Sequence, residues 1–344
     1  MLNRFNIQNR RFMGGKYRLL DFIDGAISEH CPDCASLLDI FAGTGVVANH
    51  FMARMRVGVN DNLYHNHLSH IAFMSDEAAD EKKIADLVDG FNRLEAASLE
   101  PNYMSENFGG TYFTDDVCRK IGHIRQSIQN LHDAGELTRR EMAILVTSLI
   151  YSMDRIANTC GHYDAYRRGG LEKAGPFVMN PLELSRRPVA RNMFFNDDAN
   201  RLAQSGDFGR FDCVYCDPPY NSRNYCDLYH LLENVARWQK PAVKGVARKM
   251  DRSALKSRYC GCEAAIAFQQ LVNSLDCRLI ALSYNNTGKT NVIRSSAAMT
   301  DDEIMTILSA RGKVTVYSME YTAFSAGKSF NDSNRERLFV CEVR

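Results

Sequence analysis

The residues from 36 to 61 follow a pattern that permits few folds. A short apolar run, Ser36–Phe41, stops at a glycine loop, which predicts a buried strand followed by a tight turn. Val46–Met55 has the composition of a helix, and Arg56–Asn60 is typical of a second strand that ends at Asp61. A strand, a glycine turn, a helix and a further strand make a βαβ unit, and such a unit predicts a parallel sheet.

Five more strands are expected after residue 190. They are Asn192–Asn196, Asp212–Cys216, Arg278–Tyr284, Lys313–Tyr321 and Arg337–Val343. The last two lie close together in the chain, so we expect them to pair as an antiparallel ribbon at the sheet edge. Seven mostly parallel strands with helices between them predict a doubly wound, Rossmann-like α/β fold.

The stretch between the second and third strands is of a different kind. Glu77–Leu94, Asp116–Ala134 and Thr138–Ala157 all have helical patterns, and Thr138 with Glu141 forms a capping-box signature. We therefore expect a sheet domain made of residues 1–65 and 190–344. A mainly helical insertion is expected at 66–189.

The glycine loop is a candidate cofactor site. Gly43 and Gly45 allow a tight turn and a close approach of the backbone to a ligand, and Asp61 stands where a carboxylate holds ribose hydroxyls. This pattern indicates a cofactor that contains adenosine. Residues 43–48 also satisfy the G-x-G-x-x-A pattern of dinucleotide-binding proteins, so a nicotinamide-dependent oxidoreductase stays open at this point.

A second candidate site, Asp217-Pro218-Pro219-Tyr220, directly follows a predicted strand. An aromatic amine is a poor nucleophile because its lone pair is delocalised into the ring. A carboxylate from Asp217 and the carbonyl of Pro218 can accept its two N–H groups and localise that lone pair. The two prolines keep the loop stiff, and Tyr220 offers a flat face for a base.

Together these motifs resemble those of the adenine-specific amino-methyltransferases of DNA, in the group similar to Dam. The resemblance implies a class I methyltransferase fold, the cofactor S-adenosyl-L-methionine, and methylation of the N6 amine of adenine in double-stranded DNA within a restriction–modification system. It implies catalytic roles for Asp217, Pro218, Pro219 and Tyr220. Phe12–Tyr17 and Asn196–Asn200 extend the resemblance. The cofactor-binding residues that it implies are Lys16, Asp39, Phe41, Gly43, Gly45, Asp61 and Asp198.

The charge pattern gives candidate DNA contacts. The net charge is only +1, but a basic run begins at residue 237 and has Asp251 as its sole acidic member up to residue 258. The residues expected to contact phosphates are Arg237, Lys240, Lys244, Arg248, Lys249 and Arg252. Dam-like enzymes carry their recognition region before the catalytic motif, where this chain has a short segment. We therefore expect recognition in the 65–190 insertion, the 237–262 stretch, or both.

The sequence also permits other functions and sites. An RNA or a protein amide is an alternative methyl acceptor. Cys31-x-x-Cys34 with Cys260-x-Cys262 is a weak candidate for zinc, and we expect no metal. No apolar run reaches the roughly 20 residues of a membrane span, and Met1–Arg11 lacks the apolar core of a signal peptide. We expect a cytoplasmic enzyme whose partners are DNA and a cognate restriction endonuclease.

Overall fold

The computed structural model describes residues 3–169, 171, 176–184, 188–285, 298–320 and 335–344. Contacts between Cα atoms divide the chain into two units. The sheet unit comprises residues 15–62, 188–224 and 255–344, and the helical unit comprises 1–14, 63–187 and 225–254. The expected insertion at 66–189 thus falls almost entirely in the helical unit, which two further segments of the chain join.

One seven-stranded sheet forms the centre of the sheet unit, with the order β3-β2-β1-β4-β5-β7-β6. Its strands are β1 (Ser36–Asp39), β2 (Arg56–Asn60), β3 (Met193–Phe195), β4 (Cys213–Cys216), β5 (Leu279–Asn285), β6 (Gly312–Glu320) and β7 (Arg335–Val343). The first five are parallel to one another, and β7 runs antiparallel to both β5 and β6. The expected fold class and antiparallel ribbon are confirmed, although Tyr321 lies outside the described residues.

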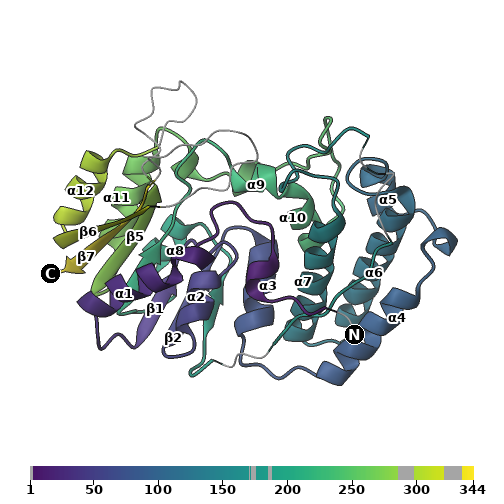
Figure 1. Ribbon diagram of the computed structural model, residues 1–344, viewed down its shortest axis with the longest axis horizontal. Helices are drawn as coiled ribbons and strands as arrows, with labels where there is room; N and C mark the ends of the chain where they lie inside the picture. Colours follow the sequence, from purple (N-terminus) through teal and green to yellow (C-terminus); the bar gives the residue numbers. More distant parts are fainter. Residues whose placement is uncertain (1–2, 170, 172–175, 185–187, 286–297, 321–334) are drawn as a thin grey trace. The chain divides into compact units, whose positions relative to one another are not determined.

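Helices cover both faces of this sheet (Figure 1). They are α1 (Leu20–His30), α2 (Val46–Phe51), α8 (Ala199–Ser205), α11 (Ala264–Ser274) and α12 (Asp301–Ser309). α1 packs against β7, and α2 packs against β1 and β2. Helix α2 ends at Phe51 and is shorter than the sequence pattern predicts, because Met52 begins a turn that leads into β2.

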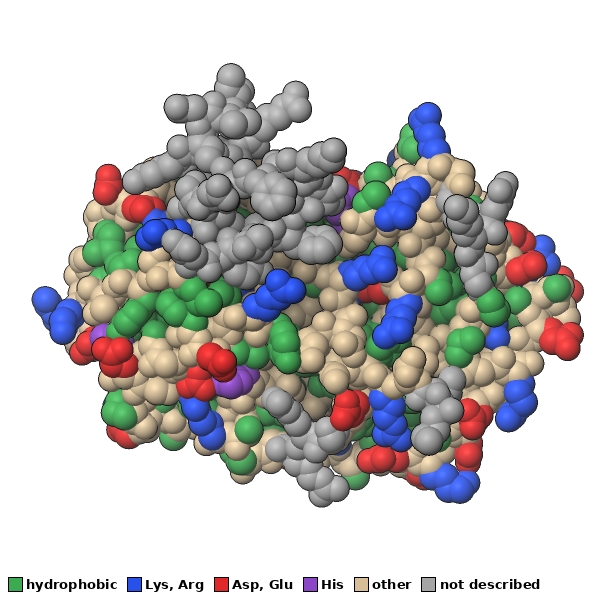
Figure 2. Space-filling view, viewed as in Figure 1, with side chains coloured by type: hydrophobic (Ala, Val, Ile, Leu, Met, Phe, Trp, Pro, Cys, Tyr) green, Lys and Arg blue, Asp and Glu red, His purple; other side chains and the backbone are tan. Residues whose placement is uncertain are grey.

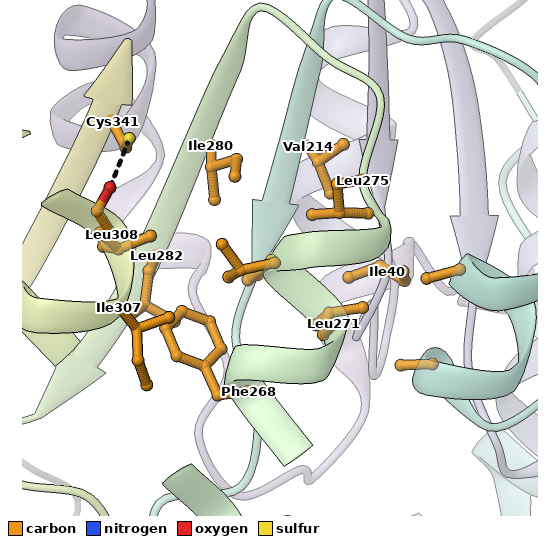
Figure 3. Close-up of a cluster of buried hydrophobic side chains, with 14 of the residues drawn as sticks. Ile40, Val214, Phe268, Leu271, Leu275, Ile280, Leu282, Ile307, Leu308 and Cys341 are labelled. Atoms are coloured by element: carbon orange, nitrogen blue, oxygen red, sulfur yellow. Dashed lines mark hydrogen bonds between the residues drawn. The ribbon is translucent and has the colours of Figure 1, made fainter. Parts of the chain in front are cut away.

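The main core of the sheet unit lies between the sheet and α8, α11 and α12. Figure 3 shows the ring of Phe268 from α11 beside Leu282 of β5 and Ile307 of α12, within this cluster of buried side chains. Burying these apolar side chains favours folding by roughly 1.5–3 kcal/mol each. Strands β1, β4 and β5 are each buried along their full length. The loops at their carboxyl ends are therefore held on a rigid base.

The helical unit is built around α7 (Arg139–Ile156), which is buried on nearly all sides from Glu141 to Asp154. Thr138 caps this helix, and its hydroxyl and the Glu141 carboxylate form the predicted capping box. Around α7 lie α3 (Tyr64–Met74), α4 (Glu81–Arg93), α5 (Tyr103–Phe108), α6 (Asp115–Asp133), α9 (Tyr225–Leu228) and α10 (His230–Arg237). Among the described residues, no helix is long and apolar enough to cross a membrane.

Candidate active site

The glycine turn after β1 has the geometry that the sequence predicts. Gly43 and Gly45 have φ angles of 53° and 82°, in the left-handed region that side chains disfavour. The backbone N–H of Gly43 donates to the Asp61 carboxylate at 2.9 Å, and Ala42 donates to the carbonyl of Asn60 at 2.9 Å. The turn is therefore fastened to the carboxyl end of β2, and α2 begins immediately after it.

Asp39, at the end of β1, is a buried carboxylate beneath this turn, with 1% of its surface exposed. Burial raises its pKa well above the ordinary value, and the neighbouring carboxylates of Asp217 and Asp61 raise it further. The backbone N–H of Ala48 acts in the opposite sense. Three predicted site residues from three different strands thus lie close enough to influence one another.

Phe41 and Asp198 also follow the carboxyl ends of strands, Phe41 after β1 and Asp198 after β3. The Phe41 ring meets Tyr259 edge-on, with centroids 5.0 Å apart, and the Tyr259 hydroxyl donates to Asn200. Asp198 caps α8 by accepting from the backbone N–H groups of Asn200 and Arg201. The sequence did not point to Tyr259, which comes from a 3₁₀ turn before α11 and carries no motif.

Asp217 follows β4 and forms an ion pair with Lys16. The Lys16 Nζ lies 3.0 Å from Asp217 Oδ1 and 3.1 Å from Glu336 Oε1, and all three side chains are largely buried. Burial lowers the pKa of Lys16, but the two carboxylates outweigh this effect and hold it well above its usual value. Sequence reasoning found Lys16 and Asp217 but missed Glu336, which stands at the start of β7.

The pKa of Asp217 is raised to about 6, mainly by burial. The Lys16 ammonium lowers it, and the Glu336 carboxylate raises it. At neutral pH the carboxylate is therefore ionised and accepts hydrogen bonds, and it takes up a proton at a pH where an ordinary aspartate stays charged.

The rest of the predicted catalytic loop is held from two sides. Pro218 is buried, and Pro219 and Tyr220 are partly exposed. The Tyr220 carbonyl accepts from the backbone N–H of Ala298, and its ring meets Tyr284 edge-on at 6.1 Å. Lys16 lies 5.9 Å from the centre of the same ring. These contacts fix the loop at the carboxyl end of β4, where open α/β sheets carry their chemistry.

The candidate DNA contacts lie in the helical unit and divide into two groups. Four of them are engaged within the chain: Arg237 with Glu233, Lys240 with Gln126, Lys249 with Asp164, and Arg252 with Asp227. Lys244 and Arg248 occupy an exposed hairpin closed by the Lys244–Lys249 bridge, and among the described residues neither side chain has an assigned partner. Figure 2 shows basic side chains gathered over the part of this unit that carries α7 and α10.

The segment Asn158–Tyr163, which follows α7, supports this hairpin. The Tyr163 hydroxyl donates to the buried Asp154, and the Tyr163 carbonyl accepts from the hydroxyl of Tyr112. The Tyr112 oxygen also lies 2.9 Å from the carbonyl of Ala247, within the hairpin, so its one hydrogen is shared between the two carbonyls. Asn158 closes its own loop through bonds to the carbonyls of Thr111 and Arg167.

The cysteines are free thiols. Across the described ranges, no group of three or more His, Cys, Asp or Glu side chains is arranged to hold a metal ion. Cys31 and Cys34 lie side by side, with burial raising the pKa of each thiol.

Comparison with known proteins identifies the chain's relatives. A family described as D12 class N6 adenine-specific DNA methyltransferase matches residues 12–299. The modification methylase StsI of Streptococcus sanguinis is 32% identical over 96% of this chain and 52% of its own length. The type II methyltransferase M.FokI of Planomicrobium okeanokoites is 29% identical over 92% of this chain and 50% of its own length.

A shorter relative matches along its whole length. The type II methyltransferase M.NlaIII of Neisseria lactamica is 26% identical over 94% of this chain and 95% of its own length. The chain therefore spans about half the length of StsI and M.FokI and nearly all of M.NlaIII. The glycine turn and the Asp217–Tyr220 loop both fall inside the matched family region.

Proposed function

The chain belongs to the D12 class of N6 adenine-specific DNA methyltransferases, and from this premise we propose that it transfers a methyl group from S-adenosyl-L-methionine to the N6 amine of adenine in double-stranded DNA. The proposed role is that of the modification enzyme in a restriction–modification system, acting in the cytoplasm with a cognate endonuclease as its partner. Family membership implies a methyl donor. That this donor is S-adenosyl-L-methionine, and that the acceptor is the N6 amine of adenine, is what we propose.

The Asp217–Pro218 corner is the observation that carries the proposal. A buried carboxylate and a neighbouring backbone carbonyl at the end of one strand provide two acceptors for the two N–H groups of an exocyclic amine. When both hydrogens are held, the nitrogen becomes more pyramidal and its lone pair points toward the methyl donor. Asp217 does not need to be a strong base, because the proton can leave after the methyl group is transferred.

The residues around the glycine turn fit S-adenosylmethionine. The carboxylates of Asp217 and Glu336 outnumber the Lys16 ammonium between them, so this end of the sheet favours a cationic ligand. We assign the ribose hydroxyls to Asp61 and the adenine to Asp198. At Gly43 and Gly45 the protein backbone would approach the cofactor closely. When bound, this cofactor supplies a methyl group on a positively charged sulfur.

Lys16 and Phe41 complete the proposed cofactor contacts. Lys16 is fixed by Asp217 and Glu336, and Phe41 is fixed by Tyr259, so both are oriented before any ligand arrives. Such preorganised side chains lose little conformational freedom on binding. Tyr220, held by Tyr284 and the Ala298 N–H, would stack on the target base.

Adenine in a duplex is inaccessible to this chemistry, so the target base must leave the stack. Unstacking costs a few kcal/mol, which stacking on Tyr220 and the two accepted hydrogen bonds would offset. Lys244 and Arg248, exposed on their hairpin, are the strongest candidates for phosphate contacts. Phosphate contacts position a duplex without reading its sequence, and we place sequence reading in the helical unit.

Plasmid DNA isolated from cells that express this chain tests the proposal. Single-molecule sequencing should report N6-methyladenine at one recurrent sequence, and plasmid from cells expressing the Asp217→Ala variant should lack it. DNA without this mark from cells that contain folded protein would overturn the proposal. RNA from the same cells, analysed for methylated bases, tests the alternative acceptor.

The cofactor is tested separately by thermal unfolding of the purified protein. S-adenosylhomocysteine should raise Tm by several degrees because it binds the folded state alone, whereas NAD should have no effect. Stabilisation by NAD and not by S-adenosylhomocysteine would favour the oxidoreductase alternative that the glycine pattern leaves open.

A further inference from the structure

We infer that Glu336 is a positioning residue for methyl transfer, which shares the Lys16 ammonium with Asp217 and so keeps the Asp217 carboxylate available to the target amine. This inference rests on the proposed function for its chemistry, although its geometry does not. Glu336 lies beyond the region that matches the family, so no motif identifies it.

Three segments that are distant in sequence bring this group together within the sheet unit. Lys16 precedes α1, Asp217 follows β4, and Glu336 is the second residue of β7. The side chain of Glu336 is 3% exposed and that of Lys16 is 6% exposed. Two buried carboxylates therefore compete for one buried ammonium, at 3.0 and 3.1 Å.

The other oxygen of Glu336 is held as well. Asn285, which is the register partner of Glu336 in the β5–β7 ladder, donates from Nδ2 to Glu336 Oε2 at 3.4 Å. The carboxylate is thereby fixed between strand β5 and Lys16.

Sharing the ammonium has a definite chemical consequence. If Lys16 paired with Asp217 alone, its charge would weaken Asp217 as an acceptor for the amine hydrogens. Because Glu336 takes part of this interaction, Asp217 keeps more of its negative charge. The ionisable groups that influence Asp217 or Lys16 at this point are Asp39 at the end of β1, Tyr215 and Cys216 of β4, Tyr220 of the loop, and Glu336 of β7.

Glu336→Gln is the primary test variant, because it keeps the shape of the side chain and one acceptor oxygen while it removes the charge. We expect kcat to fall about tenfold, in line with the cost of disturbing a positioned catalytic group. The acidic limb of the profile of kcat/KM against pH should also move to lower pH, because the negative charge of Glu336 raises the pKa of Asp217.

Two further variants separate positioning from stability. Glu336→Asp keeps the charge on a shorter arm, so the acidic limb should stay near that of wild type while kcat is reduced. Glu342→Gln is the matched control, since Glu342 lies on the same strand and pairs with His30, away from Lys16. It should leave both kcat and the pH profile unchanged.

A double-mutant cycle with Lys16→Met gives a readout that needs no substrate. Removing Lys16 leaves two buried carboxylates facing each other, and such unpaired buried charges are costly. Adding Glu336→Gln to this background should therefore raise Tm by about 3 °C or more. In the wild-type background, where Lys16 is present, Glu336→Gln should raise Tm by clearly less than this, or should lower it.

The two levels of the proposal fail in different ways. If wild type methylates DNA but Glu336→Gln leaves the acidic limb in place, or if its effect on Tm is the same with and without Lys16, Glu336 does not act through Lys16. If wild type methylates no DNA, the proposed function fails, and the thermal cycle still decides whether the three side chains are coupled.

Discussion

The backbone N–H of Gly43 donates a 2.9 Å hydrogen bond to the carboxylate of Asp61, so the glycine turn after β1 and the end of β2 form one fixed corner. The carboxylate does two things at once in the proposed function. It orders the turn, and it is the residue assigned to the ribose hydroxyls of the cofactor.

Asp61→Ala should weaken S-adenosylmethionine binding about 10–100-fold, the value of one or two hydrogen bonds to a charged group. Isothermal titration calorimetry measures this directly. Asp212→Asn is the matched control, because Asp212 accepts from the backbone N–H of Ala35 and stands at the opposite end of the parallel strands. Unchanged affinity in Asp61→Ala would remove the ribose assignment.

Asp217→Ala should abolish methyl transfer while the cofactor still binds. The carboxylate acts on the amine, and losing such a group typically costs about 10²–10⁴-fold in rate. Transfer of labelled methyl groups to DNA gives the rate, and calorimetry gives the cofactor affinity. A variant that still methylates DNA at a near wild-type rate would show that the catalytic assignment is wrong.

The pH dependence follows from the raised pKa of Asp217. Only the ionised carboxylate accepts the amine hydrogens, so kcat/KM should fall as the pH drops through about 6. An ordinary aspartate would hold activity down to about pH 4. The measurement is a profile between pH 5 and pH 8 in buffers of constant ionic strength, within roughly the range where the protein stays folded. A rate that is flat from neutral pH to pH 5 would contradict this assignment.

The two exposed hairpin residues should differ from their paired neighbours in DNA binding. Arg248→Ala and Lys244→Ala should each weaken binding and reduce the slope of log K against log salt by about one. Arg252, paired with Asp227 at 2.6 Å, is the comparison: Arg252→Ala should mainly lower Tm. Fluorescence anisotropy at several salt concentrations measures the slopes, and equal slopes for the two arginine variants would refute this division.

Local patterns predicted the frame of the site well. The glycine turn, the strand before Asp217 and the capping box of α7 each depend on neighbouring residues, so the sequence shows them directly. Boundaries were less exact. The helix expected from Glu77 begins at Glu81, because the side chain of Asp80 caps it by accepting from Lys83.

The sequence could not predict what depends on the order of strands or on pairing between distant residues. Glu336 meets Lys16 because β7 enters the sheet beside β5, and no local pattern encodes this position. The residues of the basic run likewise cannot be told apart in the sequence. In the structure, carboxylates elsewhere in the chain pair with Lys249 and Arg252, whereas Lys244 and Arg248 are exposed. Helix α3 was not predicted from the sequence, and its three histidines are buried in the structure.

The place of β7 between β5 and β6 also bears on how the protein is made. A ribosome that has finished the Asp217 loop must still add β5, β6 and the start of β7 before Lys16 can meet its second carboxylate. Until then one side of β5 lacks its neighbour, and Glu336 is not present to pair with Lys16. Under the proposed function, a growing chain therefore carries the Asp217 loop well before Glu336 is present to share Lys16 with it.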